Sequence, residues 1–310
     1  MRHRHVVSLV AAVPLIVAGG ACGGSAPGSR TTAGSEAPAT PATSASEQPF
    51  EVLDPGNFDH PTTIDNEWLP LEPGTRYVYE GTTIDDEGAA VPHRVVINVT
   101  DLTKVIGGVR TLITWDLDYS DGELVEAELA HWAQDRDGTV WHLGQYPEEY
   151  EAGKFVAAPA WIHGFEDARA GIAMKAEPRL GTRSYSQGWG PAVSWTDRGQ
   201  VDQMGQASCV PAGCYEDVLV IAETSREEPG ARQLKYYARG VGNIRVGWRG
   251  AGETTKETLE LQKVERLDSA AMAEVRAKAR EQERQGNQRS PSVYARTPPA
   301  ERALAAATGR

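Results

Sequence analysis

The chain has 310 residues, of which 43 are acidic and 31 basic, so its formal net charge is −12. This acidic balance excludes nucleic acid as a partner and disfavours binding of the protein surface to anionic lipid head groups. Any attachment to a membrane must therefore come from something other than surface charge.

The first residues predict export and lipidation. Arg2 and Arg4 form a basic start, residues 6–17 are apolar but too few to span a bilayer, and residues 18–21 are small side chains that precede Cys22. The pattern resembles a lipobox, with Gly19 where Leu, Val or Ile is usual, and it predicts acyl chains such as palmitate on Cys22. Several acyl chains would hold the protein stably on the outer face of the cytoplasmic membrane. Ordinary secretion with cleavage nearby is the alternative.

The charge and the composition of the following segment fit this location. Loss of Arg2 and Arg4 with a signal peptide of residues 1–21 takes the formal net charge from −12 to −14. Residues 22–48 are rich in Gly, Ser, Ala, Thr and Pro, and such a segment buries too little apolar surface to fold. A flexible chain of this length reaches roughly 30 Å. We expect a disordered, lipid-anchored tether.

Residues 49–267 have the pattern of one all-β domain. Short β-branched and aromatic runs alternate with turn residues, and consecutive hairpins indicate an antiparallel meander. We predict a strongly curved sheet, a half-barrel or a sandwich. The strands are expected at 77–79, 94–99, 109–119, 124–135, 139–143, 215–222, 234–238 and 258–264.

Three further features lie between and after these strands. Residues 163–178 are expected to form a long loop with at most one short helix. Cys209 and Cys214 flank a tight turn and, in an exported protein, predict a disulfide bond. Asp268 can cap a helix over residues 268–286 that docks on the sheet edge, and residues 287–310 are expected to be a flexible tail.

The central hairpin predicts a cluster of acidic side chains. In residues 113–119 the odd positions are apolar and the even positions acidic, and the partner strand alternates in the same way. A bulged loop at Asp121–Gly122 would make the two apolar sets agree. The carboxylates that then share one face are Asp116, Asp118, Glu126 and Glu128.

The same face is expected to carry Trp132 and Gln134 and, across a two-residue turn at 137–138, Trp141. Carboxylates beside two tryptophans suit a sugar-like or amphipathic ligand, because the rings cover an apolar face while the acids accept hydrogen bonds from hydroxyls. A solvated outer face with two half-covered tryptophans is the alternative.

Histidines form a second candidate site. With a two-residue turn, His131, Asp135 and His142 would lie on the opposite face of this hairpin, where they are weak candidates for metal ligands. The alternative is that this face is the core and that His131 is a hydrogen-bonded core residue. No nucleophile motif, phosphate loop or calcium loop occurs, so we predict no cofactor and leave catalysis open.

Several motifs resemble a family of exported bacterial lipoproteins, largely actinobacterial, whose activity is not established. The resemblance covers most of the domain and implies an exported location and this fold, but no reaction. It departs from the family pattern at Gln145, where a glutamate is expected, and at Arg239, where a proline is usual. The motifs are PTTIDN at 61–66, LEPGT at 71–75 with YEG at 79–81, AQD-x2-G-x-VW at 133–141, EEYEAG at 148–153, KYYARGVG at 235–242 and YARTPP at 294–299.

Three functions remain from the sequence. The first is a tethered module that binds a glycan- or lipid-like envelope ligand on the face of its sheet. The second is a hydrolase of an envelope glycan that uses two of the four carboxylates, one of them protonated by its neighbour's charge. The third is a purely structural envelope role.

Overall fold

The computed structural model describes residues 49–85 and 87–303. The signal peptide, Cys22 and the tether predicted for the N-terminal segment lie outside the described residues.

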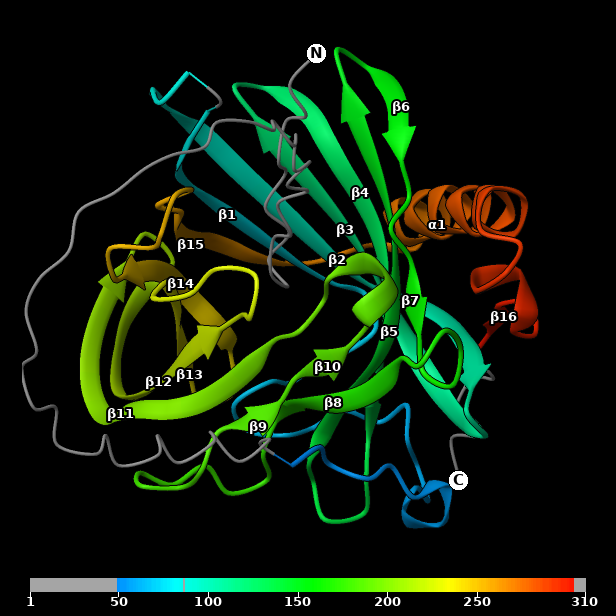
Figure 1. The fold of residues 1–310 in the computed structure, drawn as a ribbon, viewed down its shortest axis with the longest axis horizontal. Coiled ribbons are helices and arrows are strands. Elements are labelled where there is room, and N and C mark those ends of the chain that lie inside the picture. The colour runs from blue at the N-terminus through cyan, green and yellow to red at the C-terminus, as the bar shows by residue number, and fades with distance from the viewer. Residues whose placement is uncertain (1–48, 86, 304–310) are drawn as a thin grey trace, which may run out of the picture.

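Antiparallel strands form one strongly curved sheet in this part of the chain, with one α-helix near the C-terminus (Figure 1). The sheet is not closed, and the predicted all-β class with a C-terminal helix is confirmed. Two runs of consecutive strands, β1 to β5 and β11 to β15, are joined because β1 pairs with β15. The strands are β1 (Thr75–Ile84), β2 (Ala90–Ile106), β3 (Val109–Ser120), β4 (Glu123–Gln134), β5 (Val140–Glu151), β6 (Lys154–Ala157), β7 (Trp161–Ile162), β8 (Arg169–Met174), β9 (Tyr185–Ser186), β10 (Gly188–Trp189), β11 (Arg198–Val210), β12 (Gly213–Thr224), β13 (Arg232–Ala238), β14 (Gly242–Arg249), β15 (Thr258–Arg266) and β16 (Glu301–Arg302).

The two ends of the sheet meet at one short segment. β9 pairs with β11 at one end and β10 pairs with β8 at the other, and only Gln187 separates β9 from β10. The chain itself therefore links the ends without a hydrogen-bonded ladder between them. We call residues 185–189 the bridging segment.

The expectation that residues 163–178 form a loop is wrong, because they contain β8. A small residue is needed there: a Cβ atom on Gly171 would lie 2.2 Å from the backbone nitrogen of Gly188 in the bridging segment. The sequence of β8 is short and rich in Ala and Gly, which is typical of a loop. In the structure it is the strand with which the bridging segment pairs.

The two faces of the sheet are covered differently. Helix α1 (Ser269–Arg289) contacts β2 and β4 on the outer face, where Ala279 lies in a buried cluster with Ile113, Leu129 and Tyr146. It therefore packs on a face of the sheet and not on its edge as expected. The inner face carries a second core with Tyr79, Val95 and other apolar side chains of both strand runs.

The predicted cap of the helix is present, since the Asp268 side chain accepts hydrogen bonds from the backbone of Ala270 and Ala271. The helix extends to Arg289, beyond the predicted end. Among the described residues, no helix is both long and apolar enough to cross a membrane.

The prediction of a flexible tail is wrong for the described residues after the helix. A 3-10 helix, Tyr294–Arg296, follows α1, and Tyr294 is fully buried. Lys104 Nζ of β2 donates to Pro298 O over 2.8 Å, and β16 pairs with β2. Packing of the buried Tyr294 ring holds this segment in place. The segment has few apolar residues, so its order could not be predicted from the sequence.

The predicted disulfide between Cys209 and Cys214 is confirmed. It joins β11 to β12 directly before and after their turn, with 4.0 Å between the two Cα atoms. The bond clamps the end of the long β11–β12 hairpin.

Candidate functional site

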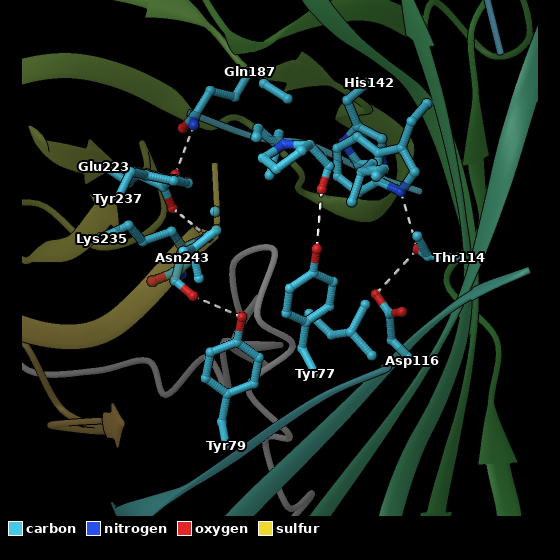
Figure 2. A pocket seen from close by; sticks show the side chains of 18 of the residues that line it. Tyr77, Tyr79, Thr114, Asp116, His142, Gln187, Glu223, Lys235, Tyr237 and Asn243 are labelled. Atoms are coloured by element: carbon cyan, nitrogen blue, oxygen red, sulfur yellow. Dashed lines mark hydrogen bonds and ion pairs between the residues drawn. The ribbon is translucent and has the colours of Figure 1, made fainter. Parts of the chain in front are cut away.

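The inner face of the curved sheet lines a partly open cavity of about 90 Å³ (Figure 2). Strands from both runs contribute to its wall, together with the bridging segment and the loops before β1 and β11. Aromatic and polar side chains alternate around it. The lining residues are Leu69, Pro70, Leu71, Tyr77, Tyr79, Ile97, Thr114, Asp116, Trp132, His142, Ala173, Gln187, Trp195, Asp197, Glu223, Lys235, Tyr237, Val241, Gly242 and Asn243.

One wall carries a chain of hydrogen bonds from β4 to β3. Trp132 Nε1 donates to Thr114 Oγ1 over 3.0 Å, and the Thr114 hydroxyl donates to Asp116 Oδ2 over 3.4 Å. The Trp132 ring stacks on His142, with 4.4 Å between ring centroids. These contacts fix the orientation of the tryptophan and engage one oxygen of the carboxyl group.

The opposite wall holds an ion pair that is satisfied internally. Lys235 Nζ lies 2.7 Å from Glu223 Oε2, and Gln187 Nε2 donates to Glu223 Oε1 over 2.6 Å (Figure 2). Both oxygens of the Glu223 carboxylate are therefore engaged. The positive and negative charges of this wall compensate each other.

Two tyrosines of β1 lie between these walls (Figure 2). The Tyr77 hydroxyl donates to Pro70 O over 3.1 Å, and the Tyr79 hydroxyl donates to Asn243 O over 2.8 Å. Burial, with a smaller contribution from the charge of Glu72, raises the pKa of Tyr77 to about 12. Because backbone carbonyls take the hydroxyl protons, the tyrosines contribute mainly their rings to the lining.

Five polar atoms of the lining have no hydrogen-bond partner among the residues that the structure describes. They are Asp116 Oδ1, Gln187 Oε1, Trp195 Nε1 and both ring nitrogens of His142. Asp116 and Gln187 are each 8% exposed, Trp195 2% and His142 1%, so bulk water does not freely solvate these atoms. Native proteins leave few buried polar groups unpaired, and those that remain call for an explanation such as a bound molecule.

Apart from the ion pair of Glu223 and Lys235, burial disfavours the charged forms of three ionisable groups of the lining, Asp116, His142 and Asp197. It raises the pKa of Asp116 to about 8 and lowers that of His142 to about 3. Burial, followed by the charge of Glu223, raises the pKa of Asp197 well above its ordinary value. With Glu223 and Lys235 paired, the described lining holds no uncompensated charge.

The four predicted carboxylates do share a face. Asp116 pairs with Glu128 and Asp118 with Glu126, so the expected shift of pairing by one residue is present. It lies at Val125 within β4 and not in the loop as expected, because Ser120 pairs with Glu123 across a two-residue loop. All four are buried, and of these four only Asp116 lines the cavity. The sequence therefore brought the acids together without showing which of them lines the cavity.

Asp118 belongs to a separate buried cluster beyond the cavity. His93 Nε2 lies 2.6 Å from Asp118 Oδ1, and His93 Nδ1 lies 3.3 Å from Glu257 Oε1. Burial alone would lower the pKa of His93, but the charge and hydrogen bond of Asp118, with the charge of Glu257, raise it to about 9. This imidazolium ion offsets part of the acidic charge on the inner face.

The expectation that Trp132 and Trp141 share a face is wrong. Gln134 pairs with Val140, so five residues rather than two form the turn, and Trp141 pairs with Ala133. A shift of pairing by one residue moves a side chain to the other face of a sheet. Trp141 belongs to the outer-face core, where its Nε1 donates to Asp135 Oδ2 over 2.9 Å.

Gln134 is placed outside the cavity lining. Its side-chain oxygen accepts hydrogen bonds from the backbone nitrogens of Asp65 and Asn66, at 3.0 and 2.8 Å. It thus fastens the loop before β1 to the end of β4.

The structure also separates the histidine trio. The five-residue turn brings His142 to the inner face beside Trp132, whereas a bulge pairs His131 with Gly144. His131 is fully buried near Tyr294 on the outer side, and Asp135 accepts hydrogen bonds from backbone nitrogens of its own turn. Across residues 49–85 and 87–303, no three His, Cys, Asp or Glu side chains are placed to hold a metal ion.

Of the twenty residues that line the cavity, the sequence had marked three as candidate site residues, namely Asp116, Trp132 and His142. Glu223, Lys235 and Gln187 come from segments distant from β3 in the chain, and no spacing signal connects them. For these residues the sequence offered one indication, the motif at residues 235–242. Lys235 and Tyr237 are two positions apart in its strand and therefore lie on the same face of the sheet. Trp195 and Asp197 lie in a loop before β11 and carried no recognisable signal.

Comparison with known proteins found limited similarity. One match is a crystal structure of a proposed exported protein with a YmcC-like fold from Bacteroides fragilis, with a TM-score of 0.38 and 10% identity, covering 64% of this chain and 99% of that one. Another is a proposed lipoprotein from Parabacteroides distasonis, with a TM-score of 0.34 and 12% identity, covering 66% and 99%. No protein-family model and no curated protein matches the sequence.

Proposed function

We propose that this chain is a lipid-anchored extracytoplasmic protein that binds a small cell-envelope ligand in the inner-face cavity. The observation that carries the proposal is the presence of five buried polar atoms without partners, on Asp116, His142, Gln187 and Trp195, around one cavity. They supply both acceptors and a donor beside aromatic rings, which is the composition of a small-molecule site.

The unpaired polar atoms favour an occupied cavity. A buried polar group without a partner costs about 1–3 kcal/mol. A ligand that pairs with several of these atoms removes that cost while it covers aromatic surface. Ordered water could pair with the same atoms, so binding would exchange water for a ligand of better shape.

Binding accounts for the cavity better than hydrolysis does. Hydrolysis of a glycosidic bond uses a protonated acid together with an ionised base or nucleophile. Of the carboxyl groups in the described lining, Asp116 and Asp197 have raised pKa values, and both oxygens of Glu223 are engaged by Lys235 and Gln187. The arrangement thus lacks an available ionised carboxylate.

The location in the proposal rests on the N-terminal sequence. The basic start, the apolar run and the small residues before Cys22 support export and acylation. The acyl anchor would attach the domain to the bilayer, and the tether would let the cavity sample the space within roughly 30 Å of it.

The test is native mass spectrometry of the protein purified from the producing envelope. We expect the protein to carry an additional mass from a bound molecule. Extraction should release this molecule so that it can be identified. Trp132→Phe, which alters the cavity wall, should lower the bound fraction at least about threefold, because one stacking surface and one indole hydrogen bond change.

Trp141→Phe is the matched control, because both tryptophans are 8% exposed but Trp141 lies on the outer face. It should leave the bound fraction unchanged. Purified protein with no bound or extractable molecule, or equal loss in the two variants, would contradict the proposal.

A further inference from the structure

We propose that the cavity takes a neutral, hydroxyl-bearing ring, the chemical class of a single sugar unit. This inference rests on the proposed function and specifies its ligand. Three independent properties of the lining lead to it: the kinds of unpaired atoms, the compensation of charge, and the combination of ring surface with limited volume.

The unpaired atoms include hydrogen-bond donors and acceptors, so a ligand that pairs with them must carry groups that both donate and accept hydrogen bonds. Gln187 Oε1 is an acceptor, Trp195 Nε1 is a donor, and Asp116 Oδ1 belongs to a carboxyl group whose other oxygen is already hydrogen-bonded. A hydroxyl group satisfies either kind of partner, and several hydroxyls on one ring satisfy donors and acceptors in different directions.

The charge balance disfavours an ionic ligand. Lys235 and Glu223 neutralise each other, with Gln187 on the second carboxylate oxygen. A phosphate, carboxylate or ammonium group entering the cavity would lose its hydration without an available counter-ion, which is costly in a buried site. The same argument disfavours charged lipid head groups.

The aromatic lining and the volume suit a ring. Trp132, Tyr77, Tyr79 and Tyr237 border a cavity of about 90 Å³. Such rings cover the apolar face of a sugar, as they do for other ligands with one apolar and several polar faces. The space holds several water molecules by the usual allowance of roughly 10–15 Å³ each, so one ring or the end of a chain fits but a whole phospholipid does not.

An acyl chain is the main competitor, and the unpaired atoms disfavour it. A hydrocarbon chain would cover Asp116, Gln187 and Trp195 without pairing them, so their desolvation would go uncompensated. Sites built to hydrogen-bond a ligand hydroxyl discriminate strongly against analogues that lack it. Selectivity should therefore favour the hydroxylated ligand.

The experiment uses the mature chain from residue 22 carrying Cys22→Ser, which removes the acyl chains and leaves the fold intact. Calorimetric titration compares neutral methyl glycosides of glucose, galactose, mannose and N-acetylglucosamine with glucuronic acid, dodecanol and dodecanoic acid. We expect saturable binding of at least one methyl glycoside, and at least tenfold weaker binding of the charged and acyl probes.

Two variants connect binding to the cavity. Trp195→Phe removes the indole donor and Asp116→Leu removes both carboxyl oxygens, and each should weaken glycoside binding about tenfold, whereas Trp141→Phe should change it less than twofold. Circular dichroism and the melting temperature establish that each variant is folded.

Each other outcome is decisive. Saturable binding of dodecanol or dodecanoic acid without any glycoside would overturn the ring inference but preserve the proposed function. Glycoside binding that is unaffected by both cavity variants would place the site elsewhere and overturn the inference. Absence of binding by every probe, with no ligand in the protein from the native envelope, would overturn both proposals.

Discussion

Asp116 shows how one residue acquires its properties from its surroundings. Strand alternation places it on a face with three other acids, which by itself gives an ordinary carboxylate. Burial beside Trp132 and the hydrogen bond from Thr114 then distinguish it, since desolvation outweighs that bond and raises its pKa to about 8. The folded state consequently holds a proton that the unfolded chain releases near pH 4.

Asp116→Asn should therefore change how stability depends on pH. Between about pH 4 and pH 8 the native carboxyl group binds more protons than the unfolded one, so its contribution to the free energy of unfolding falls as pH rises. The amide cannot ionise and should remove this contribution. We expect the variant to match the wild type near pH 4 and to exceed it by at least about 1 kcal/mol at pH 8, where each pKa unit corresponds to about 1.4 kcal/mol.

Urea unfolding at pH 4, 6 and 8 measures this difference. Asp121→Asn, at the exposed turn between β3 and β4, is the control and should show no pH-dependent gain. A difference between Asp116→Asn and wild type that stays constant across this range would contradict the raised pKa.

At the scale of elements, the cavity depends on the contact between β8 and the bridging segment. Gly171→Ala would bring a Cβ atom to 2.2 Å from Gly188 N, against backbone that cannot rotate away. We expect a loss of about 1–3 kcal/mol in the free energy of unfolding, the usual cost of overpacking. Separation of the bridging segment would also move Gln187 and weaken ligand binding.

Thermal unfolding and the glycoside titration measure these effects. The matched control is Gly247→Ala in β14, where the nearest atom to a Cβ is Tyr236 Cε2 at 3.9 Å. Equal stability of the two variants would show that β8 and the bridging segment separate without cost.

On the outer face of the sheet, the buried side chain of Lys104 connects several elements. Its ammonium group is buried, lies 2.9 Å from Glu283 Oε1, and is 4.4 Å from the centre of the Tyr294 ring. Burial lowers the pKa of Lys104, against the opposing effect of Glu283. This one side chain therefore connects β2, α1 and the segment after the helix.

Lys104→Met should destabilise the fold by about 3–5 kcal/mol, because it leaves Glu283 buried without its cation. Denaturant unfolding measures the loss, and limited proteolysis should cut within residues 290–303. The double variant with Glu283→Gln should recover part of the stability. Arg284→Met, on an exposed pair, should cost less than about 1 kcal/mol, and an equal loss there would contradict the role of burial.

At the scale of the whole molecule, the predicted arrangement is a cavity domain held near a bilayer. Cys22→Ser should transfer the protein from the membrane fraction to the soluble fraction, because it removes the acyl anchor. Cell fractionation and the mass of the N-terminal peptide measure this. Retention of the Cys22→Ser protein in the membrane would contradict anchoring through this cysteine.

The Cys209–Cys214 bond, the capped helix and eight of the strands could be predicted, because each depends on residues close together in the chain, whereas β11 and β14 were not among the expected strands. The one-residue shift that aligns Asp116 with Glu128 could also be predicted, since two alternating patterns had to agree, but its place within β4 rather than in the loop could not. The turn between β4 and β5 could not be predicted correctly. Its Asp-Gly pair fits a two-residue turn, but Asp135 accepts backbone hydrogen bonds that support five residues, and Trp141 and His142 changed faces.

Sequence alone thus determined the class of fold and the set of acids that share a face, and it predicts export and acylation at Cys22. Tertiary structure decided which face is concave, which acid borders a cavity, and what stands opposite it. The pairing of β1 with β15 brings Lys235 and Glu223 around to face the hairpin of Asp116. Contacts between strands that are far apart in the chain depend on tertiary packing and not on local residue spacing. No sequence motif could therefore predict them.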